Sequence, residues 1–135
     1  MIMKTTVDND SNLLRQISKG LLEDLRKKKI NEDIIFDIYI AFEEALRNAA
    51  VHGNKSDPDK KVTVDTEIYA DSVVIAVEDE GPGFDPESLP DPTLEENLLR
   101  EGGRGVYLIK HLMDKVEYEN GGRRVVMKKK TEIKK

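Results

Sequence analysis

Hydrophobic residues recur at helical spacing in two stretches of the N-terminal half of the chain. The first stretch begins at Ser11 and ends in a basic run at residues 27–29, where cations favour the C-terminal end of a helix. The second begins near Glu32 and ends at residues 52–54, where we expect Gly53 to adopt the left-handed conformation that closes many helices. The pattern predicts two amphipathic helices in succession.

Alternating and continuous hydrophobic runs predict strands in the rest of the chain. Residues 62–68 alternate, and the run at 73–77 is nearly all apolar, as in a strand buried on both faces or nearly so. A short helix is predicted to follow Gly105, beginning near Val106, and two further strands should meet at a Gly121-Gly122 hairpin turn.

The segregation of helices from hairpins favours one fold class. We expect an α+β two-layer sandwich, with a mixed or antiparallel sheet covered on one face by about three helices. Residues 4–7 are β-prone and form a short strand-like entry. The 135 residues suit a single domain, 1–135, because a second core would not fit.

Composition removes several classes of function. The net charge of −5 disfavours direct binding of nucleic acid, and the absence of cysteine excludes disulfides, thiolate metal sites and cysteine nucleophiles. No signal sequence and no apolar run of the ~18 residues of a membrane span is present. We therefore expect a cytoplasmic protein without a membrane contact.

The segment between residues 85 and 105 is long for a connection in so small a domain. It contains three prolines and a cluster of acids, with a possible helical turn near residues 94–99. Connections of this length are usually functional or mobile, so we expect a lid at approximately 85–104.

An acid and an amide stand four residues apart in the second predicted helix. This spacing places Glu44 and Asn48 on one helical face, at the edge of the apolar stripe. A carboxylate can take a proton, and an amide oxygen can bind a hard cation such as Mg²⁺. The pair alone also fits an ordinary solvated helix face.

Two glycine-containing segments add to this pair. Asp79, Gly81 and Gly83 directly follow the buried strand, where a carboxylate can accept a hydrogen bond from an exocyclic amine and glycines allow close approach of a flat base. A plain Asp/Gly turn is the alternative interpretation.

The second segment opens the third predicted helix. Gly103 and Gly105 can present backbone N–H groups to a phosphate, with Arg100 or Arg104 adding positive charge. Leu108 stands where a dinucleotide fingerprint needs its third glycine, and no P-loop lysine follows a glycine-rich loop. The P-loop is therefore excluded, and the dinucleotide fingerprint is strongly disfavoured.

Together these three segments resemble a known superfamily. Glu44 with Asn48, Asp79 with Gly81 and Gly83, and Gly103 with Gly105 look like the N, G1 and G2 boxes of the Bergerat-fold ATP-binding (GHKL-type) proteins. Within this superfamily, the sequences of residues 44–53 and 105–116 are most similar to those of the anti-sigma-factor serine/threonine kinases.

The resemblance implies a role for each matching residue. Asn48 would hold Mg²⁺ on the triphosphate and Glu44 would activate the attacking hydroxyl. Asp79 would bind adenine. Gly81 and Gly83 would border the base pocket, Gly103 and Gly105 would line the phosphate side, and Arg100 or Arg104 would contact the γ-phosphate.

The resemblance also implies a biological role. The chain would be a serine/threonine protein kinase that uses ATP to phosphorylate an anti-anti-sigma protein of the STAS type, and that sequesters a sigma factor. It would work as a homodimer. An ATP-gated binding regulator of the same fold, without kinase activity, is the chief alternative, and the retention of Glu44 favours the enzyme.

Two further details bear on these implications. A sensor histidine kinase fragment is the third interpretation, but no phosphoacceptor helix is recognisable and Val51 stands where those kinases usually carry a basic residue. Family members commonly have Gly-Thr before the final strand, whereas this chain has Gly122-Arg123-Arg124. The usual contact of that threonine with the nucleotide is therefore not expected here.

Overall fold

The structure is a computed structural model that describes residues 1–83 and 101–131, with the side chains of 101–104 left out. Most of the predicted lid, up to residue 100, lies outside the described residues. The elements in chain order are β1 (Ile2–Asp8), α1 (Ser11–Lys27), α2 (Glu32–Arg47), the π-turn η1 (Asn48–Gly53), β2 (Lys61–Ile68), β3 (Ser72–Glu78), α3 (Glu101–Leu112), β4 (Lys115–Glu119), the short turn η4 (Asn120–Gly122) and β5 (Arg124–Lys130).

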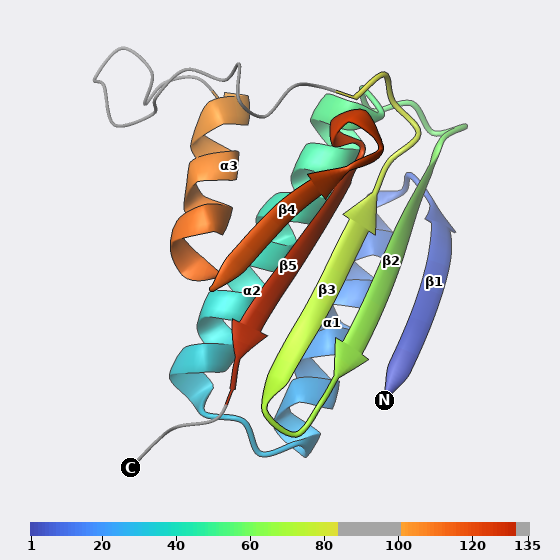
Figure 1. Ribbon diagram of the computed structural model, residues 1–135. Helices are drawn as coiled ribbons and strands as arrows, with labels where there is room; N and C mark the ends of the chain where they lie inside the picture. Colours follow the sequence, from blue (N-terminus) through green and yellow to red (C-terminus); the bar gives the residue numbers. More distant parts are fainter. Residues whose placement is uncertain (84–100, 132–135) are drawn as a thin grey trace.

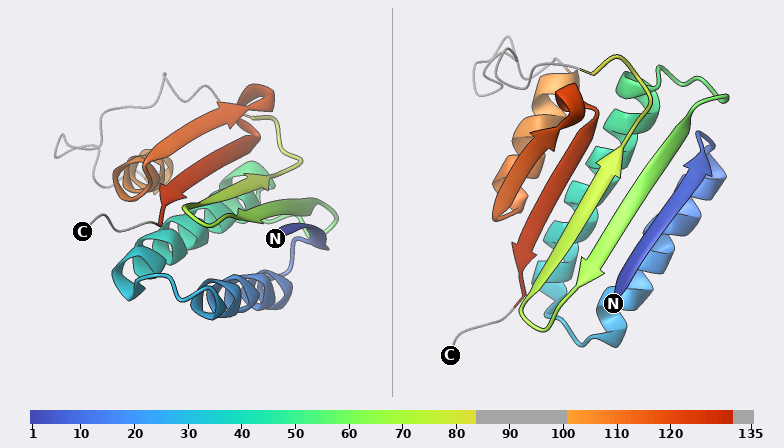
Figure 2. Two further views of the ribbon diagram at one scale, coloured as in Figure 1. Left: turned by 60° about the horizontal axis from the view of Figure 1, so that its bottom comes forward. Right: turned by 45° about the vertical axis from the view of Figure 1, so that its right-hand side comes forward.

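The five strands form one sheet, in the order β1-β2-β3-β5-β4. Each neighbouring pair is antiparallel, and the helices lie together on one face of the sheet (Figures 1 and 2). The predicted α+β two-layer sandwich is confirmed, with an antiparallel sheet.

The core lies between the sheet and the helices. Ile38 and Phe42 of α2 are fully buried against inward-facing residues of the strands, among them Ile75 and Met127. Ala76, on the opposite face of β3, is also almost completely buried, in line with the continuous apolar run of this strand. No helix among the described residues is both long and apolar enough to cross a membrane.

The predicted end of the second helix is wrong in its conformation. After Arg47 the helix widens into the π-turn η1, and the residues with positive φ are Lys55 and Ser56 rather than Gly53. Glycine is required at position 53 for a different reason, because a Cβ there would overlap the carboxyl group of Asp79. Close packing therefore accounts for this glycine.

The predicted start of the third helix is also wrong. Helix α3 begins at Glu101, so Gly103 and Gly105 lie inside its first turns and not ahead of it. An acidic residue at the start of a helix is favoured by the helix dipole. Gly105 allows α3 to pack closely on α2, since a Cβ there would lie only 2.9 Å from Glu44 Oε2.

Candidate functional site

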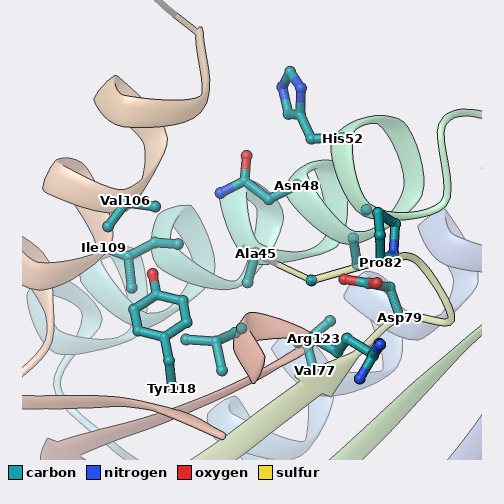
Figure 3. A pocket seen from close by; sticks show the side chains of 15 residues that line it. Ala45, Asn48, His52, Val77, Asp79, Pro82, Val106, Ile109, Tyr118 and Arg123 are labelled. Atoms are coloured by element: carbon teal, nitrogen blue, oxygen red, sulfur yellow. The ribbon is translucent and has the colours of Figure 1, made fainter. Parts of the chain in front are cut away.

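A cavity of about 210 Å³ opens between the helical layer and the ends of the central strands. Figure 3 shows Asp79 and Arg123 at one end of it and Val106 and Tyr118 at the other, with Asn48 between them. Its lining residues come from α2, η1, α3 and the strand ends, and they are Ala45, Asn48, Ala49, His52, Gly53, Val77, Asp79, Pro82, Gly83, Val106, Ile109, Tyr118, Gly122, Arg123 and Val125. A mostly apolar cavity with a few polar groups is typical of a small-molecule site.

Asn48 directly follows α2 and presents its amide to this cavity (Figure 3). Its Oδ1 is buried and accepts no hydrogen bond from any group that the structure describes. A buried polar atom without a partner is costly, so this oxygen is available to a bound cation or hydrogen-bond donor.

Glu44 and Gly105 lie beside Asn48. A Cβ at Gly105 would be 2.9 Å from Glu44 Oε2 and 3.1 Å from each polar side-chain atom of Asn48. The structure thus brings together the acid, the amide and one glycine of the third segment.

Mg²⁺ fits the residues at this end of the cavity. The unpartnered Oδ1 of Asn48 is a hard oxygen donor of the kind that Mg²⁺ prefers. Among residues 1–83 and 105–131, no three histidine or acidic side chains cluster as a metal site. Asn48 would therefore supply one oxygen ligand to the ion, and the described residues offer no all-protein metal site beside it.

Asp79 directly follows β3 and forms the polar end of the cavity. Burial raises the pKa of its carboxyl group, while the hydrogen bond from the backbone N–H of Gly81, at 2.8 Å, and the positive charge of Arg123 lower it. A half-buried carboxylate aimed into an apolar cavity can accept a hydrogen bond from the amine of a bound base.

The glycines next to Asp79 serve different parts of this arrangement. Gly83 lines the cavity and has a positive φ of 80°, which strains any other residue. Gly81 is not among the lining residues; it packs on η1, where a Cβ would overlap the carbonyl oxygen of Gly53. The segment after β3 is thus held close to the end of α2.

Asn54 is a positioning residue that sequence analysis did not identify. It is fully buried, its Oδ1 accepts from the backbone N–H of Glu80 at 2.8 Å, and its Nδ2 donates to the carbonyl of Lys61 at 2.9 Å. The amide therefore joins the end of the helix to β2 and to the residue after Asp79. An asparagine after His-Gly at a helix end is the only sequence signal for this role.

Tyr118 and His52 also line the cavity. Tyr118 belongs to β4, and burial raises the pKa of its hydroxyl to about 12. His52 lies at the end of η1. Arg100 lies outside the described residues, as does the side chain of Arg104, so their expected contact with phosphate stays a prediction.

Comparisons with known proteins identify the family of the chain. Residues 7–129 match the family described as histidine kinase-like ATPase domain. The chain is 36% identical over 104 residues to the serine-protein kinase RsbW of Listeria monocytogenes serovar 1/2a, covering 72% of this chain and 66% of that protein. It is also 36% identical over 96 residues to the serine-protein kinase RsbW of Bacillus subtilis strain 168, covering 65% and 59%.

A solved structure shows the same fold. The crystal structure of the RsbU and RsbW domains of a Mycobacterium tuberculosis protein superposes with a TM-score of 0.66 and 19% identity, covering 96% of this chain and 32% of the other. The aligned segments span only 66% and 59% of the two bacterial relatives.

Proposed function

The chain belongs to the family of histidine kinase-like ATPase domains, and from this we propose that it is an ATP-dependent serine/threonine protein kinase and anti-sigma factor. It phosphorylates an anti-anti-sigma protein of the STAS type and sequesters a sigma factor while that protein is phosphorylated. The similarity to two proteins named serine-protein kinase supports the reaction type.

One observation carries the proposal. Glu44 and Asn48 both approach Gly105, and Asn48 lines the cavity that has Asp79 at one end. A proton acceptor and a hard oxygen donor therefore stand together beside a base-sized apolar cavity, which is the arrangement that phosphoryl transfer from a nucleotide requires.

The residues have distinct tasks in the reaction. Asp79 accepts a hydrogen bond from the adenine amine, and the apolar walls exclude water from the base. Asn48 Oδ1 would hold Mg²⁺, and the ion would offset the negative charge of the phosphates. Glu44 takes the proton of the substrate hydroxyl while the hydroxyl oxygen bonds to the γ-phosphorus. The bond from that phosphorus to the β–γ bridging oxygen breaks, which releases ADP.

Three further parts of the proposal rest on the family resemblance. Arg100 or Arg104 supplies positive charge to the γ-phosphate, Gly103 lies beside the phosphates, and the protein works as a homodimer. Because a sigma factor acts together with RNA polymerase, the chain operates in the cytoplasm.

The alternative is an ATP-gated binding protein that transfers no phosphate. Such a protein needs the nucleotide cavity but has no use for a base beside Asn48. The position of the Glu44 carboxylate within contact distance of Gly105 therefore favours the enzyme.

A matched pair of variants tests the proposal. Glu44→Gln keeps the size of the side chain and removes the base, so transfer of label from γ-labelled ATP to an anti-anti-sigma protein should fall by about 10²–10⁴-fold. Nucleotide affinity should stay within about threefold of wild type. Glu43→Gln, one residue away on the same helix, is the control and should transfer label normally.

The outcomes separate the two functions. Unchanged transfer by Glu44→Gln would remove Glu44 as the base. If the wild type binds ATP and an anti-anti-sigma protein but transfers no label to that protein, the gated binder is favoured.

A further inference from the structure

Arg123 stands where the related kinases commonly carry threonine, and its side chain makes contacts that a threonine could not reach. Its Nε donates to the carbonyl of Gly81 at 2.6 Å, and its Nη1 donates to the carbonyl of Asn120 at 3.2 Å. In return, the N–H of Asp79 donates to the carbonyl of Arg123 at 3.0 Å. Arg123 therefore joins the β4–β5 hairpin to the segment that carries Asp79.

We propose that Arg123 is a positioning residue for base recognition, which fixes the Asp79 carboxylate in the geometry that accepts a hydrogen bond from the exocyclic amine of adenine. This inference rests on the proposed use of ATP. It assigns adenine selectivity in this chain to a guanidinium that lies beside Asp79 and binds the backbone carbonyls of Gly81 and Asn120.

The side chain of Glu80 anchors the first part of the segment after β3, because its Oε1 accepts from the backbone N–H of Lys61, but the part that follows is glycine-rich and needs a contact from outside. Gly81 and Gly83 pack against backbone, the first on Gly53 and the second on Gly121. Close packing limits how far the segment can approach its neighbours, but it does not hold the segment against moving away. The directional hydrogen bond from Arg123 supplies that restraint.

Asp79 has a restraint on each side. Asn54 binds the backbone N–H of Glu80, and Arg123 binds the carbonyl of Gly81. The carboxylate itself accepts from the N–H of Gly81, so the two-residue segment Glu80–Gly81 is held at its first N–H and at its last carbonyl while Asp79 points into the cavity. Removing the Arg123 side chain frees the Gly81 end of this turn.

The charge of Arg123 acts in the same direction. The charged groups that influence Asp79 are Arg123, Glu78 and Lys60, and burial of the carboxyl group opposes its ionisation. Arg123 is the positive charge with the larger effect and lines the same cavity. It therefore favours the ionised form, which is the stronger hydrogen-bond acceptor.

Calorimetric binding of ADP and of purine riboside 5′-diphosphate, which lacks only the amine, tests the assignment. The wild type should prefer ADP by about tenfold or more, because the amine meets the carboxylate only in ADP. Arg123→Met, similar in length but without charge or donors, should bring the two affinities to within about twofold or threefold. Arg15→Met, at an exposed position of α1, is the matched control and should keep the wild-type preference.

The ratio of the two affinities distinguishes positioning from general stability, since a destabilised cavity would lose both ligands alike. Arg123→Lys keeps the charge and a single donor group and should give an intermediate ratio of the two affinities. It takes the place of Arg123→Met in this test if Arg123→Met does not fold. If Arg123→Met keeps the wild-type ratio of the ADP and purine riboside diphosphate affinities, the inference is overturned. If only Arg123→Lys folds, a wild-type ratio in that variant overturns it.

Asp79→Ala separates this inference from the proposed function. It should abolish the preference for ADP. If Asp79→Ala binds both diphosphates as the wild type does, the adenine site itself is wrong. If Asp79→Ala loses the preference while Arg123→Met retains it, only the role of Arg123 is wrong.

Discussion

Replacing Gly105 with alanine should separate the stability of this protein from its activity. Gly105 lies inside α3, where alanine is favoured over glycine by about 0.5–1 kcal/mol. The added Cβ would lie 2.9 Å from Glu44 Oε2 and 3.1 Å from Asn48 Oδ1 and Nδ2, closer than ordinary van der Waals contact. The Glu44 carboxylate can rotate away at the end of its flexible side chain, so the fold has a way to relieve the contact.

The relief comes at the expense of the site. Moving Glu44 or Asn48 by a fraction of an ångström to an ångström misplaces the base or the ligand of Mg²⁺, and a misplacement of this size can reduce a rate by about 10²-fold. We therefore expect a free energy of unfolding within about 1 kcal/mol of wild type, together with a loss of about tenfold to hundredfold in phosphoryl transfer.

Gly20→Ala is the matched control. Gly20 lies in α1, and a Cβ there would meet no atom within 4 Å. This variant should gain about 0.5–1 kcal/mol of stability and keep full activity. Urea unfolding measures the change in stability, and label transfer at several Mg²⁺ concentrations measures the change in activity. Full activity of Gly105→Ala at low Mg²⁺ would refute the close approach of Glu44 and Asn48 to position 105 in the working site.

Three further predictions concern the surroundings of the site. Asn54→Ala should cost about 1–3 kcal/mol in urea unfolding, because the part-buried carbonyl of Lys61 and N–H of Glu80 lose their partner; an unchanged free energy of unfolding would contradict this. Arg124→Met should cost about 1–2 kcal/mol, since Arg124 bridges Asp65, Glu78 and Glu119 on the outer face of the sheet, and the loss should shrink in high salt. Asp79→Asn should be as stable as wild type or more stable at pH 7. Burial raises the folded-state pKa of Asp79, so ionisation costs stability as pH rises through that pKa; the advantage of Asp79→Asn should vanish below the ordinary aspartate value, and an advantage that persists there would contradict it.

The fold could be predicted from the sequence because its elements are strongly periodic. The alternation in β2 and the apolar run of β3 result directly from which faces are buried, and the start of α2 follows from the Asn31 cap, whose Oδ1 accepts from the N–H of Asp33. The family could be predicted because Glu44, Asn48 and the glycine-rich segments keep their order along the chain.

The parts that could not be predicted depend on contacts between distant segments. Gly53 looks like a helix terminator in the sequence, yet its small size is required by Asp79, 26 residues further on. Arg123 looks like a loss of the usual threonine, yet its side chain reaches Gly81. The early start of α3 likewise goes with its packing against α2, and the glycines at 103 and 105 do not predict that packing from the local sequence.

The π-turn η1 works as an angular spacer. A π-helical turn contains one residue more than an α-helical turn. One extra residue changes the direction in which the following side chains point by about 100° around the helix axis. Asn9 stabilises the widened turn by donating from Nδ2 to the carbonyl of Ala50 at 3.1 Å. Deleting one residue from the turn would make a more regular helix, but it would also rotate Gly53 away from Asp79. A better helix would thus leave the protein with a poorer nucleotide cavity, which makes this irregular turn a place where a single-residue deletion is far more harmful than most substitutions.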